Sequence, residues 1–419
     1  MTGCAVRHTA HRWTKRDRHR YYRQPQSRQL AAMKIVLAPD SFKGSLSAER
    51  VCAAVESGLR RVLPDAEIVK RPMADGGEGT LDAVLTAQSA SGSARRKQAL
   101  VKNAAGQSAE AAYALIKHGI YEAAVIEVAQ IVGIEDAHNM AVPVAERSTY
   151  GVGELVRLLL AEGIRHFFVG LGGTSTNDGG AGLLAALGVK FTGTFRRDIA
   201  PSPNGLTKLI SVDVTGLDAR LADCEITLLS DVNNPLTGER GATAIFGPQK
   251  GVAQHDIGKL DAVIDAYADR LEAALQRRAK DRPGAGAAGG LGYALQLLGA
   301  TFESGAQTVA RMVGLADACK GADWLITGEG RSDTQTLLGK TPFAAAQIAR
   351  QHGNAALKAT LISGGVDATA LAVLNETFNG GCFSIVPGPM ALDQAVIRAP
   401  ELLANAAEQI ARLLGLGRR

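Results

Sequence analysis

Residues 33–40 read Met33-Lys34-Ile35-Val36-Leu37-Ala38-Pro39-Asp40. The apolar run in this segment is short and stops at Pro39, as is typical of a strand buried within a parallel sheet. A helix should follow, because Ser47 can cap its first turn and apolar residues recur at helical spacing from Val51 until Pro64. The segment therefore predicts a unit in which a buried strand, an acidic loop and a helix follow one another.

The same unit recurs along the chain. Further strand-like runs lie at 125–128, 166–171, 226–230, 324–327, 360–363 and 383–386, and helical stretches at 153–160, 260–275, 342–350 and 400–414. Strands that alternate with helices predict an α/β fold in which parallel sheets are covered on both faces. A chain of 419 residues exceeds the usual size of one hydrophobic core, so two domains are expected. The Gly- and Ala-rich segment 282–292 is interpreted as a hinge or loop between them.

Composition indicates an ordinary globular enzyme, with 46% apolar and 21% charged residues and no apolar run long enough for a membrane span. The net charge of +5 comes from residues 1–32, where seven Arg and one Lys face a single acidic residue. Residues 33–419 hold 38 basic and 40 acidic residues, which removes the electrostatic basis for nucleic-acid binding.

Residues 1–32 have no apolar core of a secretory signal, and we expect a disordered basic extension there. An upstream start codon or a tail explains it better than a transit-like peptide, which fits the composition only loosely. The five cysteines are odd in number and lack metal-like spacing, which favours reduced thiols in a cytoplasmic protein.

Two glycine-rich segments have similar sequences, Asp75-Gly76-Gly77-Glu78-Gly79 and Asp178-Gly179-Gly180-Ala181-Gly182. Each precedes an apolar helical run, and Thr174-Ser175-Thr176-Asn177 comes directly before the second. Glycines at a helix start let the backbone approach a ligand, and free N–H groups attract phosphate or carboxylate. The segments are interpreted as ligand-binding loops; a pair of tight turns is the alternative.

Acidic residues follow several predicted strands, where ligands bind in open α/β sheets. In Asp40-Ser41-Phe42-Lys43-Gly44-Ser45, the lysine can act as a point charge for phosphate, and the aspartate can hold a metal or a substrate hydroxyl. A salt-bridged loop with a helix cap is the alternative. Asp231-Val232-Asn233-Asn234-Pro235-Leu236 is equally ambiguous, because it also suits a turn.

Two further motifs fail on their context. The sequence of segment 284–289 matches the dinucleotide-binding motif Gly-x-Gly-x-x-Gly, but no strand precedes it, as that motif requires. Gly339-Lys340-Thr341 resembles the end of a Walker A loop, yet Thr334 replaces the first glycine and Pro342 follows. No nucleophile elbow is present, and the close histidine pair, His8 and His11, has no zinc-like partners. These observations argue against a hydrolase, a zinc enzyme and a nicotinamide-dependent enzyme. A site that binds phosphate groups is the interpretation that remains.

These segments together resemble the type-1 glycerate kinase family. The matching motifs are 40–45, 74–80, 172–182, 231–236, Phe246-Gly247-Pro248-Gln249-Lys250-Gly251 and Thr327-Gly328-Glu329-Gly330-Arg331-Ser332-Asp333, in that order. The resemblance runs from Met33 to about Gly415, and residues 1–32 are the one departure from it.

The resemblance implies an ATP- and Mg²⁺-dependent kinase that makes 2-phosphoglycerate from D-glycerate in glyoxylate or sugar-acid catabolism. It also implies a Rossmann-like α/β domain, residues 33–95 and 290–419, interrupted by a second α/β domain at 96–289, with the substrates in the cleft between them.

The roles of individual residues follow as expectations. Lys43, Asp178 and Asp231 are the catalytic candidates, and Asp231, Glu329 and Asp333 the metal candidates; which acidic residue accepts the hydroxyl proton stays open. Substrate or phosphate contacts are expected at Asp40, Ser41, Gly44, Asp75, Gly76, Gly77, Gly79, Thr174, Ser175, Asn177, Gly179, Gly180, Asn233, Glu329 and Arg331.

Three alternatives stay open: a kinase that forms 3-phosphoglycerate, a kinase for a related hydroxy acid, and a non-catalytic regulator that binds hydroxy acids. The expected partners are small molecules, with neither nucleic acid nor membrane, and a homo-oligomer is left open.

Overall fold

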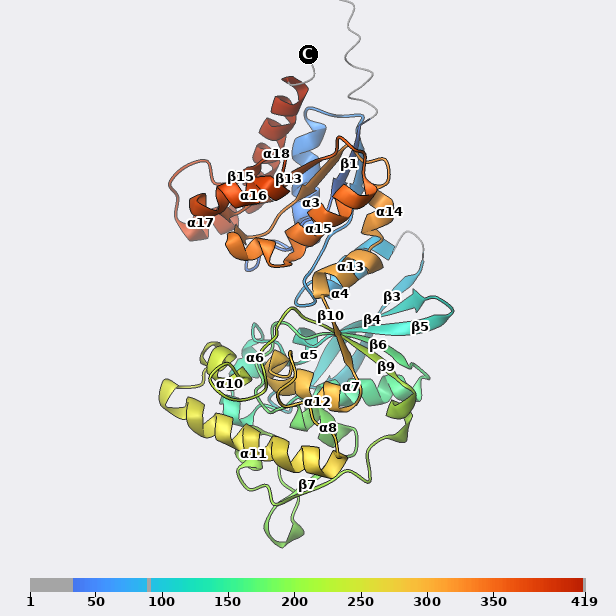
Figure 1. Cartoon of the computed structure of the whole chain (residues 1–419), viewed down its shortest axis with the longest axis vertical. Coiled ribbons are helices and arrows are strands. Elements are labelled where there is room, and N and C mark those ends of the chain that lie inside the picture. The colour runs from blue at the N-terminus through green and yellow to red at the C-terminus, as the bar shows by residue number, and fades with distance from the viewer. Residues whose placement is uncertain (1–32, 89–91, 417–419) are drawn as a thin grey trace, which may run out of the picture.

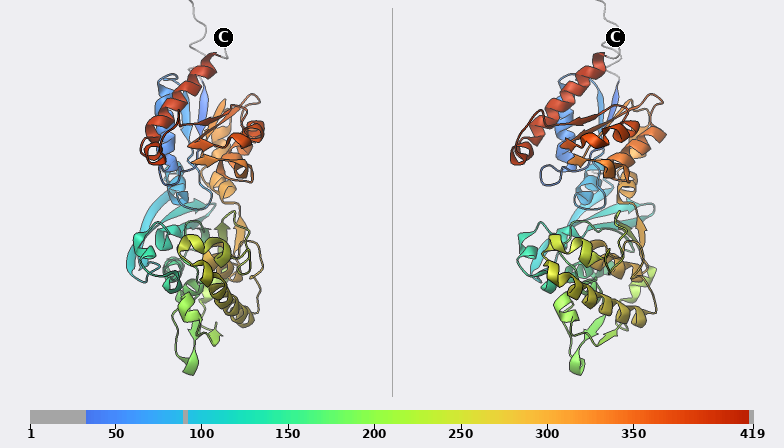
Figure 2. Two further views of the ribbon diagram at one scale, coloured as in Figure 1. Left: turned by 90° about the vertical axis from the view of Figure 1, so that its left-hand side faces the viewer. Right: turned by 60° about the vertical axis from the view of Figure 1, so that its left-hand side comes forward.

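A computed structural model describes residues 33–88 and 92–416. The basic extension predicted for residues 1–32 lies outside the described residues. Two lobes are stacked along the long axis of the molecule (Figure 1), and they remain stacked end to end in both views of Figure 2. Each lobe is built on its own sheet, so the predicted α/β fold is confirmed.

The first sheet lies in the upper lobe of Figure 1 and has the strand order β15-β13-β11-β1-β2, with every pairing parallel. Its strands are β1 (Lys34–Leu37), β2 (Glu67–Lys70), β11 (Trp324–Thr327), β13 (Lys358–Ser363) and β15 (Cys382–Ser384). Ile35 aligns with Trp324 on one side and with Ile68 on the other. The central strands are buried on both faces, which is why they read as continuous apolar runs in the sequence.

Helices cover both faces of the first sheet. One face packs against α3 (Ala48–Arg60) and α18 (Ala399–Leu416), and the other against α13 (Gly305–Met312), α14 (Leu315–Cys319), α15 (Thr341–His352) and α16 (Leu371–Thr377). The Ser47 side chain accepts a hydrogen bond from the Arg50 N–H at 3.4 Å, so the predicted cap of α3 is confirmed. Gly58 lets α3 approach α18 closely, because a Cβ atom there would lie 2.0 Å from the Ala404 carbonyl oxygen.

The second sheet has the strand order β10-β9-β6-β5-β4-β3. Its strands are β3 (Ala94–Lys102), β4 (Ser108–His118), β5 (Tyr121–Glu127), β6 (His166–Gly170), β9 (Glu225–Leu229) and β10 (Thr301–Glu303). The pairings from β5 to β10 are parallel, whereas β3, β4 and β5 form an antiparallel meander that the sequence analysis did not predict.

The main core of the second lobe lies under α7 (Tyr150–Ala161), α8 (Ala181–Ala186), α11 (Ile257–Leu275) and α12 (Leu291–Leu297). The opposite face of the second sheet packs against α4 (Thr80–Gln88), where Leu81 and Val84 contact apolar residues of β4 and β5. Helices α4 and α13 therefore sit at the junction of the two lobes (Figure 1).

The remaining elements are short. They are the strands β7 (Lys190–Thr192), β8 (Ser211–Asp213), β12 (Arg331–Ser332) and β14 (Gly365–Val366), the helices α5 (Ala129–Val132), α6 (Ala137–Met140), α9 (Pro203–Leu206), α10 (Ala242–Phe246) and α17 (Leu392–Ile397), and the 3₁₀ turns η2 (Val144–Glu146), η3 (Thr194–Arg196), η4 (Ala219–Asp223), η5 (Pro248–Lys250), η6 (Gln254–Asp256), η7 (Ala287–Gly290), η8 (Thr334–Leu337) and η9 (Ala368–Ala370).

The C-terminal end of the second lobe differs from the prediction. Strand β10 pairs with β9, so the second sheet extends to Glu303 and does not end at residue 289. The segment 282–292 is not a hinge, since Ala285, Ala287 and Leu291 are buried in the second-lobe core. Small residues are needed there for close packing: a Cβ atom at Gly289 would lie 2.1 Å from the Thr176 carbonyl oxygen. None of the helices in the described ranges combines the length and hydropathy of a membrane span.

Candidate active site

A cavity of about 710 Å³ opens at the carboxyl edge of the first sheet. The cavity is lined by residues from the loops that follow four strands: Asp40 after β1, Glu329 after β11, Gly364 after β13 and Ile385 after β15. This is the edge where open α/β sheets bind their ligands. Asp75, from the first glycine-rich segment, also lines the cavity.

The loop after β1 turns sharply and directs its polar side chains into the cavity. Phe42 bridges to Leu46, and Gly44 permits the turn because its φ is +72°. The Asp40 N–H donates to the Gly328 carbonyl at 2.8 Å, and an Asp40 carboxylate oxygen accepts from the Ser41 N–H at 2.6 Å. Burial raises the pKa of Asp40 to about 7, and the negative charge of Asp75 adds to this effect.

The first glycine-rich segment lies against the second sheet. Gly76 has a φ of +88°, and a Cβ atom there would lie 2.6 Å from the carbonyl oxygen of Leu229, the last residue of β9. Asp75 accepts a hydrogen bond from the Gly77 N–H at 2.9 Å and faces the Lys43 ammonium at 3.5 Å. Only glycine fits this approach, so the segment carries a cavity residue to the boundary between the lobes.

Glu127, at the end of β5, fixes the last part of this segment. Its carboxylate accepts the N–H groups of Gly79 at 3.3 Å and Leu81 at 3.1 Å, at the start of α4. Burial raises the pKa of Glu127 to about 7, although these hydrogen bonds act against the shift. The sequence analysis missed Glu127, because only the packing of α4 on the second sheet places it there.

Asp231 is a residue of the second lobe that lies near Asp75 of the cavity wall. It follows β9, and its carboxylate lies close enough to the Ser304 side chain and to the Gly305 backbone for both to lower its pKa. Burial raises the pKa of Asp231, and the charge of Asp75 raises it further. Of the residues expected in the site, Asp40, Lys43 and Asp75 thus line the cavity, and Asp231 of the second lobe lies close enough to Asp75 to interact with its charge.

Glu329 and Arg331 also line the cavity, but Asp333 does not. One Glu329 oxygen accepts hydrogen bonds from the Ser332 hydroxyl at 2.9 Å and the Thr336 hydroxyl at 2.7 Å. Burial raises the pKa of Glu329, and these bonds partly offset it. Asp333 instead caps η8 by accepting from the Gln335 N–H at 2.8 Å. The structure thus gives Asp333 a capping role where a metal ligand was expected.

The second glycine-rich segment is buried inside the second lobe. Asp178 is fully buried and accepts four hydrogen bonds: from the N–H and hydroxyl of Thr149 at 2.7 and 2.9 Å, and from the N–H groups of Gly180 and Gly182 at 3.0 and 3.1 Å. Burial raises the pKa of Asp178, and these bonds lower it. A carboxylate so enclosed holds its own loop and the start of α7, which argues against the catalytic role expected for it.

The neighbours of Asp178 share this environment. Gly179 donates its N–H to the Gly289 carbonyl at 3.0 Å, and Gly180 packs against Ala294 of α12. The expected contact residues that do not line the cavity are Gly44, Gly76, Gly77, Gly79, Thr174, Ser175, Asn177, Gly179, Gly180 and the exposed Asn233.

Lys250 fixes the residues that directly precede the second glycine-rich segment. It was not among the expected site residues. Its buried ammonium donates to the Thr174 hydroxyl at 3.2 Å and to the Thr176 carbonyl at 2.7 Å. Burial lowers the pKa of Lys250 to about 7, while Asp178 acts in the opposite direction. No sequence signal short of the family motif indicates this lysine, because its partners lie more than 70 residues away.

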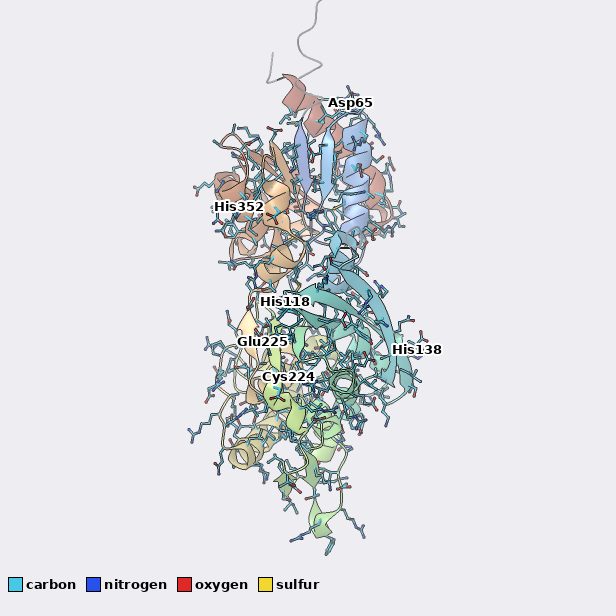
Figure 3. All side chains as sticks on the ribbon, turned by 90° about the vertical axis from the view of Figure 1, so that its right-hand side faces the viewer. Asp65, His118, His138, Cys224, Glu225 and His352 are labelled. Atoms are coloured by element: carbon cyan, nitrogen blue, oxygen red, sulfur yellow. The ribbon has the colours of Figure 1, made fainter. Side chains whose placement is uncertain are left out.

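Histidines stand outside the site. Figure 3 shows His118, His138 and His352 at separate places on the two lobes. The fold does bring His118 to 6.2 Å from His166, measured between ring centroids, a pairing that the sequence does not reveal. Within residues 33–88 and 92–416, no histidine lines the cavity.

The described residues contain no group of three or more His, Cys, Asp or Glu side chains that could hold a metal ion. Of the three metal candidates Asp231, Glu329 and Asp333, Glu329 lines the cavity and the other two do not. Asp231 belongs to the second lobe, and Asp333 is occupied as a cap. Asp40 and Glu329, by contrast, are two largely buried carboxylates in the wall of one cavity, after neighbouring strands. Such a pair fits a Mg²⁺ ion that shares its remaining ligands with phosphate and water.

Comparison with known proteins gives a consistent result. Residues 35–415 match the model of the glycerate kinase family. The chain is 38% identical over 392 residues to the glycerate kinase of Bacillus subtilis (strain 168), covering 92% of this chain and 99% of that protein. It is also 38% identical over 393 residues to the glycerate 2-kinase of Escherichia coli (strain K12), with the same coverage. A crystal structure from Salmonella typhimurium LT2, described as a glycerate kinase 2, superimposes with a TM-score of 0.76 at 38% identity, over 92% of this chain and 99% of that chain.

Proposed function

The chain belongs to the glycerate kinase family, and from this premise we propose that it transfers the terminal phosphoryl group of ATP to the 2-hydroxyl of D-glycerate. One observation carries the proposal: Asp40, Lys43 and Asp75 of the first lobe line a cavity large enough for both substrates, and Asp231 of the second lobe lies close enough to Asp75 for the two carboxylates to interact. The products are 2-phosphoglycerate and ADP.

Phosphoryl transfer asks the protein for in-line positioning and for neutralisation of charge. The hydroxyl oxygen of glycerate forms a bond to the γ-phosphorus, and the bond from that phosphorus to the β,γ-bridging oxygen breaks. The electron pair of the broken bond leaves with ADP, and the hydroxyl proton passes to a carboxylate. Lys43 suits the negative charge of either the glycerate carboxylate or the transferred group, because its ammonium reaches the cavity beside Asp75.

Asp231 is our choice for the carboxylate that takes the proton. It belongs to the second lobe and lies close enough to Asp75, a residue of the cavity wall, to interact with its charge, so a hydroxy acid bound between the lobes would meet it. A raised pKa brings an aspartate closer to the range in which a general base is efficient. Asp178 is no longer a candidate, because its oxygens are committed to its own loop.

Asp40 and Glu329 would hold Mg²⁺, which would neutralise charge on the phosphates when it is bound. The remaining cavity residues bind and orient the substrates. Ser41 and Arg331 lie in the same wall and can donate hydrogen bonds to phosphate oxygens.

The test is incubation of the protein with ATP, Mg²⁺ and D-glycerate, with the product isomer assigned by phosphorus NMR. We expect one new phosphomonoester signal, that of 2-phosphoglycerate. A 3-phosphoglycerate signal would correct the position of transfer. Binding of glycerate without any ATP consumption would replace the proposal by that of a non-catalytic binding protein.

A further inference from the structure

A second cavity, of about 500 Å³, opens in the second lobe. It lies between the segment 140–147, helix α9 and the first turns of α11, and none of its lining residues lines the cavity at the first sheet. Its wall is largely apolar and includes Met140, Val144, Val252, Leu260 and Val263. This volume and this kind of wall are typical of sites for small molecules, and the proposed reaction does not use the cavity.

Arg147 forms the polar end of the second cavity. The residue is only 3% exposed. Its guanidinium donates to four backbone carbonyls: Nε to Val142 at 2.9 Å, Nη1 to Ser175 at 3.0 Å and Lys250 at 2.9 Å, and Nη2 to Met140 at 3.4 Å. Because a guanidinium has five N–H groups, one N–H of Nη2 has no acceptor among the described residues. The bond from Nη2 to Met140, a residue of the cavity wall, is also long, so this nitrogen has capacity for a ligand.

The positive charge of Arg147 has no carboxylate partner in the described part of the chain. The guanidinium bonds to backbone carbonyls alone, and burial lowers the pKa of Arg147. Asp178 acts on the neighbouring Lys250, but its oxygens are bonded within its own loop and to Thr149. Buried charges in proteins are normally paired, because the loss of hydration otherwise has no compensation. A ligand carboxylate in the cavity would supply both the counter-charge and the missing acceptor.

The charged residues at the rim leave this positive charge in place. Lys259 and Asp256 both line the cavity and pair with each other at 3.7 Å, and Asp256 also faces His255 at 3.3 Å. The charges of Lys259 and Asp256 cancel, so the charge of Arg147 decides the sign. The cavity therefore suits a small molecule with one carboxylate and an apolar body. D-Glycerate is a poor match, because its two hydroxyl groups would face an apolar wall.

Arg147 also connects the second cavity to the loop 172–177, which precedes and enters the second glycine-rich segment. The guanidinium bonds to the Ser175 carbonyl, and the Lys250 ammonium bonds to the residues on either side of Ser175. The loop begins at the lobe boundary, where a Cβ atom at Gly172 would lie 2.5 Å from the Gly77 Cα atom. A ligand bound to Arg147 would thus restrain a loop that contacts the first glycine-rich segment.

We propose that the second cavity binds a small monocarboxylate with an apolar body, whose carboxylate pairs with Arg147, and that the bound molecule restrains the loop 172–177. The apolar wall holds the body of the ligand, and the unused N–H of Arg147 donates to the carboxylate. The inference stands apart from the proposed reaction, because the two cavities share no residue.

The probes for a test are phenylacetate and phenylacetamide, which have nearly the same shape and differ in charge. Calorimetric titration of the full chain should show that the acid binds about tenfold or more tightly than the amide, and excess D-glycerate should not displace it. Arg147→Met should remove this preference. Val263→Trp should fill the cavity and abolish binding of the acid. Its matched control is Ala262→Trp, at the exposed neighbouring position of α11 outside the cavity wall, which should bind the acid normally.

A thermal melt checks that each variant is folded, since Arg147→Met also loses the bonds to four carbonyls; Val263→Trp keeps them and tests the site by itself. Hydrogen exchange tests the restraint. Saturation with the acid should slow exchange of the amides of 172–177 in the wild type and in Ala262→Trp, but not in Val263→Trp.

Equal affinity for the acid and the amide, or normal binding of the acid by folded Val263→Trp, would overturn the site. Unchanged exchange at 172–177 under saturating acid would overturn the restraint on the loop. These measurements need no turnover, so their outcome is independent of whether the protein phosphorylates glycerate.

Discussion

The Lys43 ammonium lies 3.5 Å from the Asp75 carboxylate, and this contact joins two loops of the first lobe at the boundary with the second. The charge of Asp75 raises the pKa of Lys43, so the lysine stays positively charged at neutral pH. Both side chains are partly exposed, and an ion pair of this kind adds little to stability. Its value lies in placement, because it holds a cation at the mouth of a cavity that anionic substrates would enter.

Replacement of Lys43 by Met should therefore reduce activity without unfolding the protein. We expect kcat/KM for glycerate to fall by about 10²–10³, as on loss of one charged contact to the transferred group. Steady-state kinetics and a thermal melt measure the two effects. Lys320→Met is the matched control, since Lys320 also pairs with an aspartate, Asp317, but on the surface away from the cavity. An unchanged kcat/KM for Lys43→Met would remove Lys43 from the site.

Asp231→Asn and Asp178→Asn should have opposite consequences. At position 231, the amide cannot accept the hydroxyl proton, and we expect kcat to fall by about 10²–10⁴ with little change in melting temperature. Single-turnover rates at saturating substrates test this, because they report chemistry separately from product release.

At position 178, the amide nitrogen would face donors that now bond to a carboxylate oxygen, such as the Thr149 and Gly182 N–H groups. One or more buried donors would lose their acceptor, at a cost of about 1–3 kcal/mol in the free energy of unfolding. Urea denaturation measures this loss. A stable Asp178→Asn protein with a large fall in kcat would return Asp178 to the catalytic residues.

Glu127 should make stability depend on pH. Its pKa is about 7 in the folded state, against 4.5 for an unperturbed glutamate, so the folded protein keeps a proton that the unfolded chain loses. Its contribution to the free energy of unfolding is therefore greatest below about pH 4.5, falls as the pH rises to 7, and stays low above that. The nearby charge of Asp82 acts in the same direction, while Gln130 and the start of α4 supply hydrogen bonds that oppose it.

Glu127→Gln removes this titration. Relative to the wild type, the variant should gain about 2–3 kcal/mol between pH 4.5 and 8, from about 1.4 kcal/mol per unit of pKa shift. Urea denaturation at several pH values measures the difference. Parallel stability curves for the two proteins would contradict a buried, titrating Glu127.

Gly58→Ala should destabilise the first lobe. The new Cβ atom would lie 2.0 Å from the Ala404 carbonyl oxygen, so α3 and α18 must separate and lose packing around Leu59 and Leu403. Overpacking of this kind costs about 1–3 kcal/mol or more, which a thermal melt detects. The control is Gly258→Ala in α11, where no atom lies within 4 Å of the added Cβ; there we expect unchanged or slightly higher stability.

The sequence alone determined the local structure of the first sheet. The apolar run at 33–38, the Ser47 cap and the strands at 324–327 and 360–363 could be predicted because buried parallel strands and helix caps depend on neighbouring residues. The order of the six motifs along the chain also indicated the family, which the comparisons confirm.

Tertiary structure decided which motifs meet. Asp75-Gly76-Gly77 and Asp178-Gly179-Gly180 read alike, but the first packs on the end of β9 beside the cavity and the second is enclosed by α11 and α12. Likewise, Gly339-Lys340-Thr341 fails as a sequence motif, yet the βα crossover from β11 brings it to the carboxyl edge next to Asp40. Local sequence cannot distinguish these cases, because a turn has the same backbone requirements in a core as at a site. The difference arises only when distant strands pair and place one turn in a cavity and bury the other.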